Sequence, residues 1–199
     1  MLKQSGAIAA LLLTLVVCPG LALAQSIGAK GGVNFTSVSF EEGSFASDSS
    51  AGAGFTVGGV IGLKLFGPVF LQGEVLFTEQ RVTLEEVVDD RFRMLEVPVL
   101  LRFRAFGTAP GMTVHVTGGV VYGSVLSAQE TVSGETYDIK DAVESWRLGA
   151  AAGAEVEFLP RWTAGFRYVY GVSKIYRTFS GGEAGTPMTM QITVGYRFK

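Results

Sequence analysis

The stretch that decides the fold is RFRMLEVPVLLRFRAF, which runs from Arg91 to Phe106. From Leu95 onwards its odd positions carry apolar side chains, namely Leu95, Val97, Val99, Leu101 and Phe103. Its even positions include the charged residues Glu96, Arg102 and Arg104. Because successive side chains of an extended chain point to opposite sides, a strand here has one apolar face and one ionic face. A helix would mix the two sets and would lose an interior hydrogen bond at Pro98, so we predict a β-strand.

The same alternation occurs in seven further segments of the chain. They are residues 27–36, 55–65, 69–80, 112–126, 146–158, 162–172 and 188–198. Each is close to the length of ~9–11 residues that a tilted strand needs to cross a bilayer. The pattern predicts an all-β fold, an eight-stranded antiparallel up-and-down transmembrane β-barrel.

The connections between these segments alternate between short and long. Tight turns rich in Gly and Pro occupy residues 67–68, 107–111 and 159–161, whereas long polar loops occupy residues 36–54, 81–90, 127–145 and 173–187. Outer-membrane barrels have short periplasmic turns and long external loops. We therefore expect both ends of the barrel domain to lie on the periplasmic side.

The first 24 residues have the pattern of a secretory signal. Lys3 precedes an apolar stretch, and Ala22-Leu23-Ala24 forms a small-x-small cleavage site. The alternative is an uncleaved membrane anchor, since the apolar stretch is nearly long enough to span a bilayer. We expect residues 1–24 to be removed and residues 25–199 to form a single barrel domain.

Composition limits the function classes further. Cys18 is the only cysteine and lies in the expected signal, so we expect no disulfide in the exported protein. A formal net charge of −2 is too mild to suggest a nucleic-acid partner. No segment reaches the ~18 consecutive apolar residues of a membrane helix, and alternating strands account for the positive mean hydropathy.

Alternation alone leaves open which face points inward. A soluble barrel of the lipocalin type would enclose the apolar side chains and expose the charges. Two features favour a membrane barrel instead. Many glycines share the charged face, where they leave room in a narrow interior: Gly28, Gly32, Gly58, Gly62, Gly119, Gly149, Gly153, Gly165, Gly171 and Gly195. Aromatic residues of the apolar face gather near both strand ends, as in interfacial girdles: Phe35, Phe55, Phe77, Trp146 and Tyr170 towards the loops, and Phe103, Phe158, Trp162 and Phe198 towards the turns.

The interior of an eight-stranded barrel is just wide enough for side chains to fill it. Charges in such a place must pair and accept hydrogen bonds to be tolerated. We therefore predict a packed network of ion pairs with trapped water and no continuous pore. Its members are Lys30, Lys64, Glu74, Glu96, Arg102, Arg104, Arg147, Glu155, Glu157, Arg167 and Arg197.

Several strand motifs resemble the PorT-type, porin-like outer-membrane β-barrel family common in Bacteroidota. They are IGAKGGVNFTSV, LQGEVLFTEQ, LEVPVLLRF, VTGGVVYG, AGAEVEF and ITVGYRF. The resemblance implies an eight-stranded barrel of OmpA/OmpX-like architecture in the bacterial outer membrane, with one branch of the family tied to protein secretion. The expected partners are outer-membrane lipids and lipopolysaccharide, the barrel-assembly machinery during insertion, and envelope or secretion-complex proteins.

The sequence gives little support to catalysis. A lipid-modifying acyltransferase is the enzyme alternative, and it would need a histidine, a serine and an acidic residue near the outer rim. His115 is the only histidine, and its place beside the 107–111 turn predicts a hydrogen-bonding role at the periplasmic end of the lumen. We expect no enzyme activity, no metal site and no cofactor.

The external loops are the candidate interaction surface. Acidic residues of two loops predict an acidic outer rim: Glu41, Glu42 and Asp48 in the first, and Glu85, Glu86, Asp89 and Asp90 in the second. The plain interpretation is solvated loop charge. The alternatives are a divalent-ion bridge to lipopolysaccharide phosphates and adhesion to a basic partner.

Overall fold

A computed structural model describes residues 26–39, 50–84, 88–107, 111–132, 135–140, 143–173 and 186–198 of the chain. These residues form nine β-strands. The strands are β1 (Ser26–Ser39), β2 (Ser50–Phe66), β3 (Val69–Leu84), β4 (Val88–Phe106), β5 (Thr113–Val132), β6 (Glu135–Asp138), β7 (Trp146–Phe158), β8 (Trp162–Gly171) and β9 (Thr186–Arg197). No helix within these ranges is long and apolar enough to cross a membrane.

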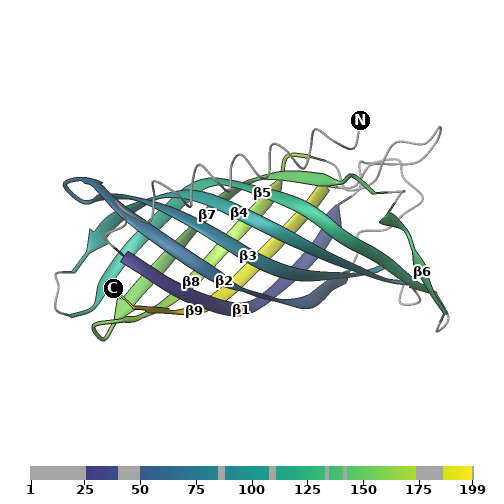
Figure 1. Cartoon of the computed structure of the whole chain (residues 1–199), viewed down its shortest axis with the longest axis horizontal. Helices are drawn as coiled ribbons and strands as arrows, with labels where there is room; N and C mark the ends of the chain where they lie inside the picture. Colours follow the sequence, from purple (N-terminus) through teal and green to yellow (C-terminus); the bar gives the residue numbers. More distant parts are fainter. Residues whose placement is uncertain are drawn as a thin grey trace.

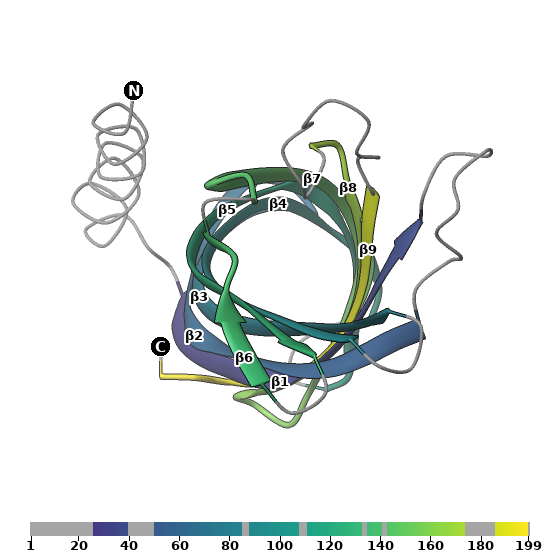
Figure 2. The same cartoon turned by 90° about the vertical axis from the view of Figure 1, so that its right-hand side faces the viewer.

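All strands except β6 form one closed antiparallel barrel. Each pairs with its neighbour along the chain, β5 pairs with β7, and β1 closes the ring by pairing with β9 from Gly28↔Arg197 to Ser39↔Thr186. The view along the barrel shows the ring without a free edge (Figure 2). The predicted fold class, an eight-stranded up-and-down barrel, is therefore confirmed. Closure leaves no unpaired backbone edge to face lipid.

The short turns all lie at one end of the barrel, which is also where β1 begins and β9 ends (Figure 1). Gly67 and Gly107 adopt φ angles of 50° and 90°, a left-handed backbone that glycine adopts without steric cost. Leu159 takes the same conformation, with φ of 60°, in the turn between β7 and β8. By the rule that periplasmic turns are short, this is the periplasmic end.

The strands extend further at the other end than the alternation predicted. Most of the predicted loop at residues 81–90 is strand, with β3 and β4 paired from Arg81↔Arg91 to Leu84↔Val88. β5 likewise continues to Val132 and pairs with β6, which was not predicted. Figure 1 shows β6 at the far end from the turns. The prediction stopped short because apolar residues no longer point outward in these segments.

Some predicted features lie outside the described residues. These are the signal at residues 1–24, most of the fourth loop, and the rim residues Glu41, Glu42, Asp48, Glu85 and Glu86.

The apolar face of each strand points away from the barrel axis, and the ionic face points inward. Val57 and Leu101 are 51% and 54% exposed on the outer surface, whereas Glu74 is 1% exposed inside. Of the nine expected girdle residues eight are exposed, among them Phe55, Trp146, Phe103 and Trp162, and Phe77 is half-buried. This is the arrangement of a membrane barrel and the reverse of a lipocalin, in which the apolar face would surround a cavity.

Candidate functional site

The candidate site is the barrel interior, which has three parts along its axis. Nearest the turns is an ionic layer, formed by Lys30, Glu74, Arg102, Glu155, Glu157, Arg167 and Arg197. Glu96 lies above it among neutral polar side chains. An apolar cluster lies at the external end.

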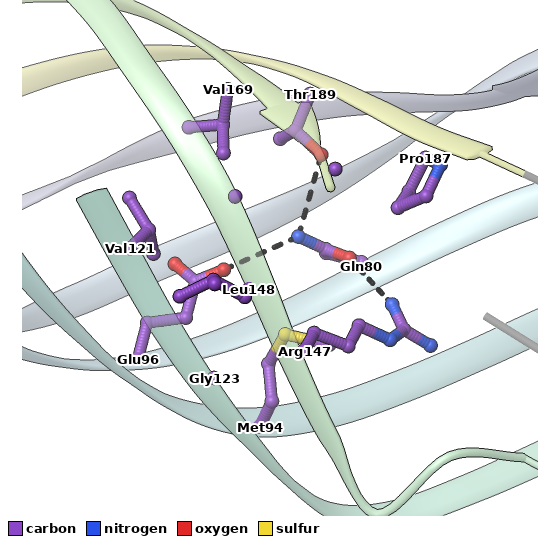
Figure 3. A pocket seen from close by; sticks show the side chains of 12 residues that line it. Gln80, Met94, Glu96, Val121, Gly123, Arg147, Leu148, Val169, Pro187 and Thr189 are labelled. Atoms are coloured by element: carbon purple, nitrogen blue, oxygen red, sulfur yellow. Dashed lines mark hydrogen bonds between the residues drawn. The ribbon is translucent and has the colours of Figure 1, made fainter. Parts of the chain in front are cut away.

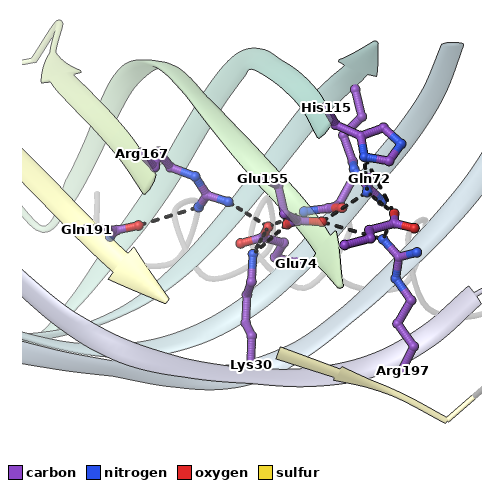
Figure 4. A network of polar contacts seen from close by, with 10 residues as sticks. Lys30, Gln72, Glu74, His115, Glu155, Arg167, Gln191 and Arg197 are labelled. Atoms are coloured by element: carbon purple, nitrogen blue, oxygen red, sulfur yellow. Dashed lines mark hydrogen bonds and ion pairs between the residues drawn. The ribbon is translucent and has the colours of Figure 1, made fainter. Parts of the chain in front are cut away.

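Glu74 on β3 is the centre of one half of the ionic layer. Its Oε1 atom lies 2.8 Å from Lys30 Nζ and 2.6 Å from Arg167 Nη2, and it accepts a hydrogen bond of 2.6 Å from Gln72 Nε2. Lys30 also lies 3.6 Å from Glu155 Oε2. Since β3 and β8 are not neighbours in the sheet, the contact between Glu74 and Arg167 spans the lumen (Figure 4).

The other half of the layer is built on Glu155 and Glu157 of β7. Arg102 Nη2 lies 2.9 Å from Glu155 Oε1 and 2.6 Å from Glu157 Oε1. Arg197 Nη2 lies 2.5 Å from Glu157 Oε1 and 3.4 Å from Glu155 Oε1. Burying a charge is costly unless it is paired, and in this layer each carboxylate contacts at least two cations. The ionic layer is thus a set of braces between strands that share no backbone hydrogen bonds.

His115 borders the ionic layer near the periplasmic end. It is 2% exposed, and its Nδ1 atom lies 3.3 Å from Arg102 Nη2 and 3.6 Å from Glu157 Oε1. Its ring meets Phe70 edge-on at a centroid distance of 5.8 Å. Phe70 points inward, because it occupies an even position on β3, as Glu74 does.

The hydrogen-bond partners of Glu96 are neutral, although the sequence predicts Glu96 as a member of a network of ion pairs. It accepts hydrogen bonds from Thr78 Oγ1 at 2.9 Å, Gln191 Nε2 at 3.3 Å and Gln80 Nε2 at 3.4 Å. Gln80 in turn accepts a hydrogen bond of 3.3 Å from Arg147 Nη1 (Figure 3). A cavity of about 40 Å³ adjoins these groups, which exceeds the ~10–15 Å³ that one water molecule occupies by the same measure.

An apolar cluster that sequence reasoning missed lies at the external end of the lumen. Its buried members are Val38, Val82, Phe92, Met94, Val125, Ala128 and Val143, and Ile139 packs against them. The chain after β6 is held there by hydrogen bonds from Ile139 N to Ala128 O at 3.0 Å and from Val125 N to Ser145 O at 2.9 Å. The guanidinium of Arg147 lies 4.5 Å from the Phe92 ring centroid, a cation–π contact beneath the cluster.

A sequence signal for this cluster exists. In the outer parts of β3 and β4 the inward positions, such as Val82 and Phe92, become apolar while the outward positions become charged. The alternation therefore inverts where the strands leave the hydrocarbon. Beyond the place where the strands leave the hydrocarbon, β6 is fully exposed. Tyr137 of β6 donates a hydrogen bond to Glu135, and this bond raises the pKa of the tyrosine.

Four predicted residues depart from their expected places. Lys64 is exposed at the periplasmic end, outside the ionic layer. Arg104 stacks over Phe70, with its guanidinium carbon 5.4 Å from the ring centroid, and Arg147 lies above the layer. Asp90 is only 2% exposed, so it does not contribute to a solvated rim. The continuation of β4 explains this burial, because an even position on that strand points inward.

The described residues contain no group of three or more His, Cys, Asp or Glu side chains able to hold a metal ion. The polar residues that sequence reasoning left out of the network are Gln72, Thr78, Gln80 and Gln191. The sequence could have indicated them, because they occupy the same inward-facing alternate positions of their strands as the charged residues.

The closed barrel, its apolar outer face and its polar interior define a bacterial outer-membrane β-barrel protein. A family model described as "outer membrane protein beta-barrel domain" matches residues 23–177, and the chain belongs to that family. The predicted location in the outer membrane is confirmed.

The chain is similar to solved structures at low sequence identity. Neisserial surface protein A is 12% identical, with 86% of this chain and 97% of that protein covered and a TM-score of 0.50. Ail, the attachment invasion locus protein of Yersinia pestis, is 17% identical over 87% and 98%, with a TM-score of 0.49. OprG from Pseudomonas aeruginosa is 12% identical over 88% and 97%, with a TM-score of 0.49. No curated protein matches the sequence significantly.

Proposed function

We propose that the protein is a non-conducting structural barrel of the outer membrane, which presents its external end for interaction with other envelope components. The observation that carries this proposal is the bracing of Glu74 by Lys30 and Arg167 from two other strands. These contacts cross the interior, and the external apolar cluster lies above them. A hydrated ion passing through would have to separate the ion pairs and the apolar cluster.

Conductance in planar bilayers tests the closed lumen. The purified protein is reconstituted at neutral pH, with a general porin as the positive control. We expect no channel events above the bilayer background. Reproducible channels formed by the wild-type protein would contradict the proposal. The same channels should then appear with the Lys64→Gln variant, because its altered residue lies outside the ionic layer.

We propose further that the protein is not an enzyme. His115 is buried at the periplasmic end of the lumen, away from the outer leaflet that supplies lipid A. Incubation with phospholipid donors and lipid A acceptors should give no acyl transfer, and a product that disappears in the His115→Gln variant would refute this.

The interaction role includes two kinds of partner. The resemblance to PorT-type barrels supports an envelope or secretion complex, and β6 offers an exposed surface for it. A photo-crosslinking residue at Tyr137 should capture a protein in intact cells, whereas the same residue at Leu159 in a periplasmic turn should not.

Lipopolysaccharide is the proposed lipid partner, because the external half of the barrel lies beside the outer leaflet.

A further inference from the structure

Three arginines and one glutamate form a charged patch on the outer surface of the β3–β4 hairpin. The strands place Glu79 opposite Arg93 and Arg81 opposite Arg91. These positions have the same parity as Val99 and Leu101, so they are on the face that points away from the lumen. We call Arg81, Arg91 and Arg93 the arginine patch.

Glu79 holds the arginine patch together but leaves it positively charged. Its Oε1 atom accepts hydrogen bonds from Arg81 at 2.9 and 3.2 Å, and its Oε2 atom accepts one of 3.1 Å from Arg93 Nε. Arg91 Nε lies 3.8 Å from Oε1. One carboxylate therefore serves three guanidinium groups.

The negative charge of the patch is buried, whereas its positive charges are exposed to the surroundings. The Glu79 side chain is 6% exposed, whereas the side chains of Arg81, Arg91 and Arg93 are 50%, 42% and 41% exposed. Like charges directly opposite each other destabilise a strand pair, as Arg81 and Arg91 would without a counter-charge. The exposed guanidinium edges thus offer several N–H donors to an anion.

The arginine patch lies directly above the apolar belt of the barrel. The next outward pair towards the membrane is Phe77↔Leu95, and the Phe77 ring contacts Phe55 at a centroid distance of 6.0 Å. Aromatic residues of barrels lie at the level of the lipid headgroups. The patch is therefore at the height of the outer-leaflet headgroups, just outside the hydrocarbon.

We propose that the arginine patch binds the phosphate groups of a lipid A-type headgroup in the outer leaflet. The inference rests on lipopolysaccharide as the proposed lipid partner, but it does not depend on the closed lumen. Planar guanidinium groups match phosphate oxygens through paired hydrogen bonds. The apolar side chains below would contact the acyl chains of the same lipid, which favours a lipid over a soluble anion.

Binding to purified lipid A tests the proposal. The full barrel in nanodiscs of neutral lipid is titrated with bisphosphorylated lipid A and with the same lipid A after removal of its phosphates. We expect the wild-type protein to bind the phosphorylated form at least about tenfold more tightly, with a preference that falls as salt rises. Equal affinity for the two lipids would overturn the proposal, and so would displacement by millimolar inorganic phosphate.

Variants localise the binding. The triple variant Arg81→Gln, Arg91→Gln and Arg93→Gln should lose the preference for phosphorylated lipid A, whereas Arg161→Gln, an exposed arginine at the periplasmic end, should keep it. Heat-modifiable gel mobility shows that each barrel is folded, and if the triple variant does not fold, the single Arg91→Gln variant takes its place. A folded patch variant that keeps the full preference would overturn the proposal, whatever the conductance experiment shows.

Discussion

Glu74 illustrates how single residues hold the interior together. Its carboxylate lies between Lys30 and Arg167, and all three side chains are at least 90% buried. Such a group does not gain stability merely by being charged, since desolvation offsets much of the ionic attraction. Removing one member of the set is nevertheless severe, because it leaves the other charges buried without a partner.

We expect Glu74→Ala to destabilise the barrel by about 3–5 kcal/mol, the usual cost of breaking a buried ion pair. Glu96→Ala should cost less, about 1–3 kcal/mol, because its neighbours are neutral donors. Lys64→Ala is the matched exposed control and should change stability by no more than about 0.5 kcal/mol. Denaturant unfolding in detergent measures all three, and equal effects of Glu74→Ala and Lys64→Ala would show that the ionic layer does not brace the barrel.

A second prediction at the residue scale concerns glycines at which the backbone of a neighbouring strand comes close. A Cβ atom added at Gly32 would lie 1.9 Å from the carbonyl oxygen of Ile192, whereas one at Gly59 would have its nearest neighbour at 3.9 Å. Gly32→Ala should therefore destabilise the barrel by about 1–3 kcal/mol, and Gly59→Ala should be nearly neutral. Comparison of their unfolding midpoints tests this, and a neutral Gly32→Ala would contradict the close contact between β1 and β9.

At the element scale, the β3–β4 hairpin shows what alternation can and cannot predict. Within the membrane, lipid requires apolar side chains on the outside, so parity alone identified the strands and the inward charges of the ionic layer. Above the membrane the requirement ends, which is why Phe92 turns inward, Glu79 turns outward and the loop predicted at residues 81–90 is mostly strand. The partners of each charge, such as Arg167 for Glu74, depend on how the closed ring aligns distant strands. The sequence of a single strand does not contain this alignment.

The external apolar cluster gives the prediction for this scale. We expect Phe92→Ala to speed amide exchange at Ile139, at Val143 and in the outer ends of β4 and β5, which contribute to the cluster that contains Phe92. Exchange in β6 should also speed up, because β6 pairs with the outer end of β5. Exchange around Leu76 in the membrane part should stay slow. Hydrogen–deuterium exchange in nanodiscs measures both regions, and a uniform increase along the whole barrel would mean that the cluster is not a separate unit.

The whole molecule is a closed cylinder with lipid outside and packed side chains within. The outer surface positions the barrel in the membrane, the ionic layer and the apolar cluster fill its interior, and the arginine patch lies at the boundary where hydrocarbon meets headgroups. Family and location follow from the sequence pattern and fold, whereas the proposed interaction role depends on external residues whose charges the membrane does not constrain.

The central claim concerns which side chains meet lipid. Methyl-resolved NMR of the barrel in nanodiscs tests it directly, through magnetisation transfer from lipid acyl chains and from water. We expect the methyl groups of Leu101 and Ile192 to contact acyl chains, and those of Leu76 and Leu100 to contact protein alone. Acyl contacts at Leu76 or Leu100, or strong transfer from bulk water to them, would contradict a packed interior within a lipid-facing apolar wall.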